Sequence, residues 1–319
     1  MDIRKGAIDF SYSTNPYSPR FIERYLKQAE FEKYPYCEDG LEEKIKSKFG
    51  IREEVTLGAG ITELLYMVAH ATRKAPSMIM RHTYGEYERV SRLFGKPVHF
   101  IDSLDPDVGV FSSKKNFTIF FANPNNPTGK LYDYIEELID STQRNNSTLV
   151  LDESFINFAD RKPKYSFADN LIVLRSFTKE YGIPGIRIGY AISTKSFKKK
   201  LAEYRMPWGI GAAGCAAIDA ILKNQSYLST TLPKIKNERY KLEKRLGLRT
   251  GANFFLAEVA DAGEATRLLE ENGVLVRDCT SFGLPAMIRF SVKKPKENRK
   301  LVAALVKLKR LSLPSGVRY

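Results

Sequence analysis

The sequence lacks any uninterrupted apolar run approaching the roughly 20 residues that a membrane-spanning helix needs. It begins MDIRKGAIDF, which carries charges but neither an apolar core nor a small-residue cleavage site, so we expect no signal peptide. Cysteine is scarce: Cys37, Cys215 and Cys279 lie far apart, and there is no Cys-x-x-Cys pair. This scarcity of cysteine indicates neither a zinc site nor a disulfide framework, and it predicts a reducing, cytoplasmic location. Because no apolar run is long enough to span a membrane, we also expect no membrane partner.

Acidic residues are also in deficit, because 37 Asp and Glu stand against 51 Lys and Arg, a formal net charge of +14 at pH 7. A basic excess can indicate a nucleic-acid partner. Here the lysines are spread along helix faces, as in KSFKKK and KIKNERYKLEKRLG, and no recognised nucleic-acid motif accompanies them. We therefore expect no nucleic-acid partner, but a protein that attracts small anions, phosphates in particular.

The length and the hydrophobic pattern predict an α/β protein with two subdomains, since 319 residues are long for one ordinary core. From about residue 55 to 201, short apolar runs such as SMIM, FTIFFA and LIVLR alternate with amphipathic helical segments. This alternation is typical of a mostly parallel sheet covered on both faces. A small-residue helix, a long charged helix over about 232–246 and an α+β pattern follow. We expect an N-terminal segment (1–30) that packs near the site, a large domain (31–208) and a small C-terminal domain (209–319).

Glycine, aromatic and polar residues follow the predicted strands, at the points where the strands end. These residues are Gly58, Ala59 and Gly60 after EVTL, Tyr84 after SMIM, Asn126 after FTIFFA, Asp152 after TLVL, and Ser176 and Lys179 after LIVLR. Ligands of such sheets bind beyond the carboxyl ends of the strands. We therefore expect these side chains to converge on one site.

Two of these residues have chemistry that depends on their surroundings. Lys179 could be an ordinary surface lysine or, if desolvated beside a carbonyl, a nucleophile that forms a Schiff base. Asp152 could cap a helix, bind a metal or pair with a protonated pyridine nitrogen. The sequence has only three histidines, and none clusters around Asp152, which disfavours the metal.

The other strand-end residues fit a phosphate and a flat ring. Backbone N–H groups of the helix that opens after GAG can hold a phosphate, to which Ser176 and Arg187 would add a hydroxyl and a guanidinium. Tyr84 can stack on a ring or simply pack in a helix, and Asn126 can donate to a phenolic oxygen or simply form a turn. Together these groups match pyridoxal phosphate, with no metal.

The motifs NPNNPTG, LDESF, SFTK and GIRIGY occur in an order and spacing that resemble the fold-type I pyridoxal-phosphate enzymes of the class I/II aminotransferase superfamily. The resemblance covers nearly the whole chain. It implies a mostly parallel seven-stranded sheet with helices on both faces and a smaller α+β C-terminal domain. It also implies pyridoxal 5'-phosphate as cofactor and a homodimer with shared active sites.

The resemblance assigns roles to individual residues. Lys179 would form the Schiff base with the cofactor and move the proton, and Asp152 would pair with the pyridine nitrogen. Asn126 would bind the ring oxygen, and Tyr84 would stack on the ring. The cofactor phosphate would be held by Ala59, Gly60, Ile61, Ser176 and Arg187, and by Tyr34 of the neighbouring subunit.

Within the superfamily, the runs NPYSP, YPY, VRDC and MIRFSV resemble two groups that act on small phosphorylated amino substrates. One is histidinol-phosphate aminotransferase of amino acid biosynthesis, and the other is threonine-phosphate decarboxylase of cobalamin biosynthesis. The resemblance makes Arg277 and Arg289 the substrate-anion arginines and places Asn15 near the substrate amine or carboxylate. Two arginines on adjoining strands could equally be surface residues.

The remaining details divide between the two groups. DFSYSTNP, IPGIRIGY, MPWGIG, RDCTSFGL and Phe155, where many aminotransferases have tyrosine, favour the decarboxylase. However, the decarboxylases usually begin with a longer segment containing His-Gly-Gly, whereas this sequence starts at Met1 with no such segment. His82 also replaces a commoner proline. Amino transfer is also the commoner activity of the superfamily. We expect a histidinol-phosphate-type aminotransferase, with the decarboxylase as alternative and a non-catalytic cofactor-binding regulator as a remote one.

Overall fold

The computed structural model describes residues 6–36, 38–102, 115–224 and 226–312, and its centre is a seven-stranded sheet. The strands are β2 (Glu54–Gly58), β3 (Ser77–Met80), β4 (Val98–Ile101), β5 (Thr118–Ala122), β6 (Thr148–Asp152), β7 (Leu171–Ser176) and β8 (Gly189–Ser193). They lie in the order β2-β8-β7-β6-β5-β3-β4. β8 pairs antiparallel with β2 and β7, and the other pairs are parallel, which confirms the predicted sheet.

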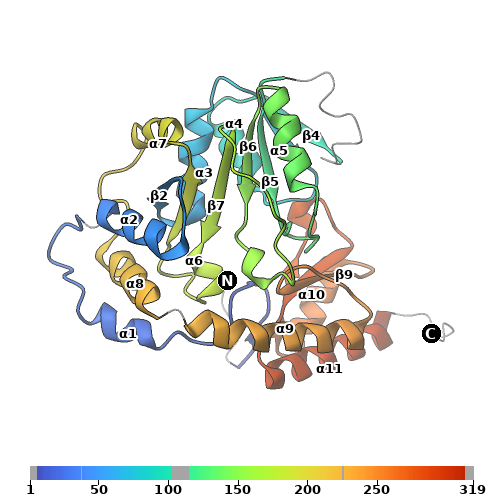
Figure 1. Cartoon of the computed structure of the whole chain (residues 1–319). Helices are drawn as coiled ribbons and strands as arrows, with labels where there is room; N and C mark the ends of the chain where they lie inside the picture. Colours follow the sequence, from blue (N-terminus) through green and yellow to red (C-terminus); the bar gives the residue numbers. More distant parts are fainter. Residues whose placement is uncertain (1–5, 37, 103–114, 225, 313–319) are drawn as a thin grey trace.

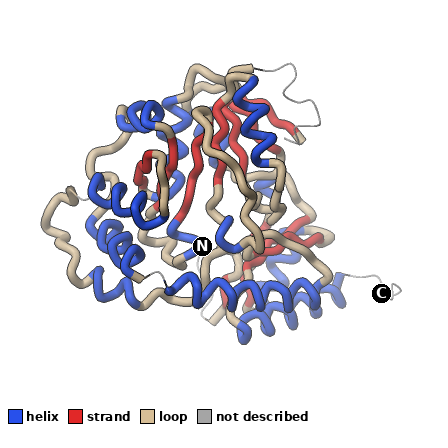
Figure 2. The backbone as a smooth tube through the Cα atoms, in the orientation of Figure 1, coloured by secondary structure: helices blue, strands red, loops and turns tan. Residues whose placement is uncertain are grey.

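Helices cover both faces of the sheet (Figures 1 and 2), because successive strand residues point to opposite faces. Leu149 and Leu151 of β6 belong to one core, and Val150 between them belongs to the other. The first core also contains residues of α1 (Phe21–Leu26), α2 (Glu38–Phe49), α5 (Ile135–Arg144) and α8 (Ala212–Lys223). The second contains residues of α3 (Gly60–Ala71), α4 (Glu86–Leu93) and α7 (Lys195–Ala202).

The C-terminal part forms a smaller α+β unit beside the carboxyl ends of β5, β6 and β7. Its antiparallel sheet has the order β11 (Arg277–Asp278), β12 (Met287–Ser291), β9 (Phe254–Glu258). Its helices are α9 (Ser226–Leu246), α10 (Ala262–Glu271) and α11 (Pro295–Ser312), of which α9 and α11 lie side by side (Figure 1). The N-terminal segment joins this unit, because β1 (Ile8–Asp9) pairs parallel with β10 (Val274–Leu275).

The sequence pattern missed three features of this arrangement. β4 was not predicted, because it is four residues long and exposes His99 and Phe100 at the sheet edge. α9 begins at Ser226, earlier than expected, and contains Pro233 in its interior. The buried residues of α8, among them Ile218, lie in the core of the large sheet. We therefore propose that the boundary between the two units falls after α8 rather than at residue 209.

Candidate active site

A cavity of about 330 Å³ lies where the ends of β5, β6 and β7 meet β11, β12 and the N-terminal segment. Of the predicted site residues, its lining brings together Ile61, Tyr84, Asn126, Asp152, Ser176, Lys179, Arg187, Arg277 and Arg289. These residues are spread over most of the sequence. Their convergence follows from the parallel strands, whose carboxyl ends share one edge of the sheet.

Lys179 and Asp152 lie on neighbouring elements at the centre of this edge. Lys179 is in the short helix α6 (Phe177–Glu180), which follows β7 directly. Burial lowers the pKa of Lys179, and the charges of Arg289 and Arg187 lower it further. Asp152, only 5% exposed, accepts hydrogen bonds from the Tyr87 hydroxyl at 2.6 Å and the Ser154 N–H at 2.9 Å. Burial raises the pKa of Asp152, although these bonds and Lys179 act in the opposite direction.

A second group of residues gathers at the start of α3. Gly60 has a φ of +75°, and a Cβ built there would lie 2.6 Å from Nη2 of Arg187. Arg187 also has a positive φ, +58°, and its Nη1 donates to the Pro184 carbonyl at 3.1 Å. The Ser176 hydroxyl lies 2.7 Å from that of Thr178. The arrangement places a guanidinium and two hydroxyls beside a helix N-terminus, which suits a phosphate.

The side of the cavity next to β3 and β5 carries aromatic and amide groups. Tyr84 meets Tyr87 edge to face, with ring centroids 5.5 Å apart, and burial raises the pKa of Tyr84. Asn126 accepts a hydrogen bond at Oδ1 from Nη1 of Arg289. Phe155, 7% exposed, also lines the cavity, with its ring centre 6.0 Å from Nζ of Lys179. These groups can flank a flat ring.

The two candidate substrate arginines lie next to each other on β11 and β12, where Arg277 and Arg289 are register partners. Arg289 is 8% exposed, and its Nη2 donates to the Ser11 carbonyl at 2.8 Å, while its buried Nε has no partner in the described structure. Burial lowers the pKa of Arg289 to about 10. Arg277 is exposed and donates to the Ser281 hydroxyl at 2.7 Å. A buried guanidinium without a described carboxylate partner favours binding of an anion.

Four predicted residues lie outside the cavity lining: Asn15, Tyr34, Ala59 and Gly60, the last of which stands beside Arg187. The Asn15 side chain is already bonded, because its Nδ2 donates to the Glu180 carbonyl and the Thr231 hydroxyl, both at 2.9 Å. It therefore holds the N-terminal segment against the chain that follows Lys179, and its place near the substrate stays a prediction. The Ala59 N–H donates to the Glu63 carboxylate, and Tyr34 is 68% exposed.

Several lining residues were missed by the sequence analysis. Thr62 and Thr178 stand next to predicted residues in the runs GIT and SFTK, and these runs were the available signal. Tyr87 follows Tyr84 by three residues in YGEY, and its N–H donates to the Tyr84 carbonyl at 3.2 Å in the turn that leads into α4. Tyr12 and Phe282 could not be found by pattern, because they reach the cavity only through the docking of the small unit.

The cysteines differ in state between the two that the structure describes. Cys279 is free and buried, whereas Cys215 is disulfide-bonded, a bond that the sequence analysis did not predict when it found no indication of a disulfide framework. Cys37 lies outside the described residues. Within the described ranges, no group of three or more His, Cys, Asp or Glu is placed to hold a metal ion. None of the described helices is both long and apolar enough to span a membrane.

Comparison with known proteins agrees with this geometry. A family model described as aminotransferase class I and II matches residues 8–305. The chain is 31% identical to a protein named histidinol-phosphate aminotransferase 1 from Archaeoglobus fulgidus, over 93% of this chain and 98% of that protein.

Two solved structures share the fold along nearly the whole chain. L-threonine-O-3-phosphate decarboxylase from Porphyromonas gingivalis matches with a TM-score of 0.82 and 26% identity, over 95% of this chain and 99% of that one. Histidinol-phosphate aminotransferase from Clostridium acetobutylicum matches with a TM-score of 0.84 and 24% identity, with the same coverage of 95% and 99%. The chain belongs to the class I and II aminotransferase family.

Proposed function

We propose that the protein is a pyridoxal-phosphate-dependent enzyme that acts on a small phosphorylated amino substrate, as an aminotransferase of the histidinol-phosphate type. The observation that carries the proposal is the single cavity in which Lys179 and Asp152 lie with Arg187, Arg277 and Arg289. The name of the relative from Archaeoglobus fulgidus supports the same activity.

The residues present fit this cofactor. Asp152 forms no ion pair within the described ranges, so its buried carboxylate suits a protonated ring nitrogen. At Gly60 the backbone approaches Arg187 so closely that a Cβ would collide with the guanidinium, which suits a phosphate held against bare backbone. When bound, pyridoxal phosphate supplies an electron sink for the bond that breaks at the substrate α-carbon.

The cavity arginines that the cofactor would not use define the substrate class. Arg187 would hold the cofactor phosphate and Asp152 would hold the ring nitrogen, which leaves Arg277 and Arg289 for the substrate. Register partners on antiparallel strands have Cα atoms about 4.5–5.5 Å apart, so both guanidinium groups can reach one small molecule. A phosphate, alone or with a carboxylate, satisfies both.

Lys179 is the residue that moves the proton. Its lowered pKa favours the neutral amine, which can accept a proton from the substrate α-carbon and return it. Tyr84 and Phe155 supply aromatic surface to the cavity lining, and Asn126, held by Arg289, would orient the cofactor ring. The bond between Asn126 and Arg289 joins the large unit to the small one at the cavity.

Decarboxylation of L-threonine-O-3-phosphate is the second candidate. Phe155 lines the cavity without a hydroxyl that could bond a cofactor ring oxygen, and the decarboxylase structure from Porphyromonas gingivalis shares this fold at 26% identity. Arg277 and Arg289 would then bind the phosphate and the carboxylate of one substrate. The bond at the substrate α-carbon that lies perpendicular to the cofactor ring would be the one that breaks, and this would decide between amino transfer and decarboxylation.

An absorbance scan of the cofactor-loaded protein separates these activities. Histidinol phosphate or L-threonine phosphate is added without a keto acid, and carbon dioxide is followed in parallel. Accumulation of the amine form of the cofactor with histidinol phosphate supports the aminotransferase. Carbon dioxide release from L-threonine phosphate, with the aldehyde form retained, establishes the decarboxylase. No change with either compound refutes both, and Lys179→Ala should abolish either reaction but spare a regulator.

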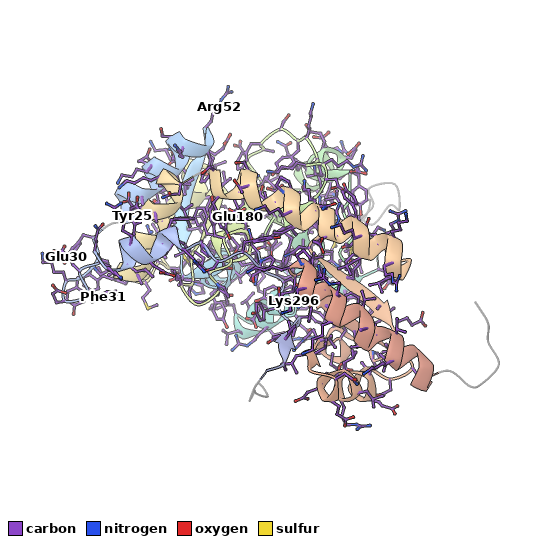
Figure 3. The ribbon with its side chains drawn as sticks, turned by 90° about the horizontal axis from the view of Figure 1, so that it is seen from below. Tyr25, Glu30, Phe31, Arg52, Glu180 and Lys296 are labelled. Carbon is purple, nitrogen blue, oxygen red and sulfur yellow. The ribbon has the colours of Figure 1, made fainter. Side chains whose placement is uncertain are left out.

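We also propose a homodimer with shared sites. Exposed aromatic and apolar side chains gather in two chain segments, with exposed fractions of 67% for Phe31, 68% for Tyr34, 84% for Tyr36, 62% for Met206 and 44% for Trp208. Tyr34 packs on Trp208 with ring centroids 4.6 Å apart. Phe31 lies at one extremity of the molecule (Figure 3), where a second copy could cover it. Surface patches of this kind mark protein interfaces.

A further inference from the structure

His82, the residue in place of a commoner proline, lies in the turn between β3 and α4. Its φ is +54°, a left-handed conformation that few non-glycine residues adopt. Its carbonyl accepts a hydrogen bond from Nδ2 of Asn125 at 3.0 Å, and Oδ1 of Asn125 accepts one from the Thr83 hydroxyl at 2.6 Å. The unusual backbone is therefore held by the loop that carries Asn126.

The His82 side chain crosses to the small unit. Its Nδ1 lies 2.9 Å from the carbonyl oxygen of Phe282, and it donates the hydrogen bond because a carbonyl only accepts. The ring also lies against Gly283, where a Cβ would be 3.4 Å from Nδ1. Gly283 has a φ of +75°, so the segment after η3 (Thr280–Phe282) turns closely around the imidazole.

Phe282 and Arg277 form one wall of the active-site cavity. The guanidinium of Arg277 lies 5.6 Å from the Phe282 ring centre and donates to Ser281, so Arg277 rests on η3. Phe282 also lines a second cavity of about 240 Å³, together with His82, and so separates the two spaces.

The other hydrogen bonds of η3 stay within the small unit. The Phe282 N–H donates to the Cys279 carbonyl at 2.9 Å, and the Thr280 N–H donates to Asp278 at 2.7 Å. In the described part of the chain, the bond to His82 is the hydrogen bond that ties this wall to the large unit.

We propose that His82 is a positioning residue for substrate binding: it fixes Phe282, and through Phe282 and Ser281 it holds Arg277 at the distance at which the guanidinium meets the substrate phosphate. The inference rests on the proposed function, because it takes the anion at Arg277 to be the substrate's. An exposed arginine samples many conformations, and small misplacements of a binding group cost much of its effect.

Three substitutions at position 82 distinguish the effect of the imidazole donor from the effect of the unusual backbone conformation. Asparagine tolerates a positive φ and carries an amide donor near the position of Nδ1, glycine tolerates the φ without a donor, and alanine offers neither. With the phosphorylated substrate that the native enzyme turns over, we expect His82→Ala and His82→Gly to raise KM about tenfold with little change in kcat. His82→Asn should stay within about threefold of the native KM. The effect of Arg277→Gln should shrink in the His82→Ala background, because both changes remove the same contact.

Calorimetric titration of inorganic phosphate into the cofactor-loaded proteins tests the inference without turnover. Weaker phosphate binding in the alanine and glycine variants, with native-like binding in the asparagine variant, supports it. Equal phosphate binding in all four proteins, or a fall in kcat at constant KM, overturns the inference, because His82 would then not affect substrate binding. Native-like binding in the glycine variant also overturns it, because the backbone conformation rather than the imidazole would then be responsible. If the native protein turns over neither substrate, the proposed function fails, while the phosphate titration still decides on His82.

Discussion

At the scale of single residues, Asp152 combines a buried carboxylate with two donors that favour its charged form. Burial raises its pKa, whereas the Tyr87 hydroxyl and the Ser154 N–H lower it. The balance matters for the proposed function, in which a charged Asp152 would pair with a protonated ring nitrogen of the cofactor. Tyr87 is itself buried, and the charge of Asp152 helps to raise the pKa of its hydroxyl, so that the hydroxyl stays a donor.

Tyr87→Phe should therefore raise the pKa of Asp152 further and lower the activity about tenfold, because a hydrogen bond to a charged group contributes roughly 1.5–3 kcal/mol. Since Asp152 would then stay protonated to higher pH, the acid limb of the kcat/KM profile should shift upward. pH–rate profiles of the two proteins measure this shift. Tyr132→Phe is the matched control, because Tyr132 is buried outside the cavity. A shift of the same size in both variants would contradict the assignment.

At the scale of elements, the turn after α6 packs directly against the backbone of the N-terminal segment. The Asn15 N–H donates to the Lys179 carbonyl at 2.8 Å, and Gly182 follows with a φ of +66°. A Cβ on Gly182 would lie 2.5 Å from the Asn15 carbonyl oxygen, whereas one on Gly185, in the same loop, would meet nothing within 4 Å. The chain thus places a glycine where two backbones touch.

Gly182→Ala should destabilise the protein by more than about 1 kcal/mol, through the unfavourable φ and the displaced segment, and should lower activity as Lys179 shifts. Gly185→Ala should change the free energy of unfolding by less than about 0.5 kcal/mol. Urea unfolding measures both. Equal effects would mean that the close approach to Asn15 contributes nothing.

Lys96, in the connection between α4 and β4, links the end of α3 to β5 through its amine. It is 3% exposed, and its Nζ donates to the carbonyl and hydroxyl of Thr72 at the end of α3 and to the hydroxyl of Thr118 in β5. No described carboxylate pairs with it, and burial lowers its pKa from 10.5 to about 7. Between these two pH values the unfolded chain binds more protons at Lys96 than the folded one, so stability rises with pH across this window.

Relative to Lys96→Met, the native protein should gain up to about 1.4 kcal/mol of stability per pH unit between pH 7 and pH 9. Urea unfolding of both proteins at pH 7, 8 and 9 tests this trend, whatever the sign of the difference at any one pH. A constant difference between the two proteins would show that Lys96 keeps its ordinary pKa in the fold.

Part of the site could be predicted from the sequence, and part of it could not. Asp152, Ser176 and Lys179 were predictable, because apolar runs mark the strands and parallel strands end at one edge. The bonded role of Asn15 and the contact between His82 and Phe282 were not, since they join segments more than 160 residues apart through docking. Hydrophobic periodicity describes one element at a time and carries no information on docking.

At the scale of the whole molecule, the exposed aromatic segment around Tyr34 and Trp208 predicts association. Replacing Phe31 and Tyr36 by serine should weaken self-association at least about tenfold, because aromatic anchors dominate interface energetics. Leu93→Ser is the control, since Leu93 is 61% exposed at the end of α4, away from this segment. Sedimentation over a range of protein concentrations measures the association.

Tyr34→Phe distinguishes a role of Tyr34 in the subunit interface from a role in binding the cofactor. The phenyl ring keeps the packing on Trp208, so association should stay native. If Tyr34 donates its hydroxyl to the cofactor phosphate of the second subunit, the variant should bind pyridoxal phosphate several-fold more weakly. The native protein should then also lose cofactor on dilution, in step with dissociation into single chains. A native protein that sediments as a single chain at all concentrations and retains its cofactor would refute the shared site and leave Tyr34 a surface residue.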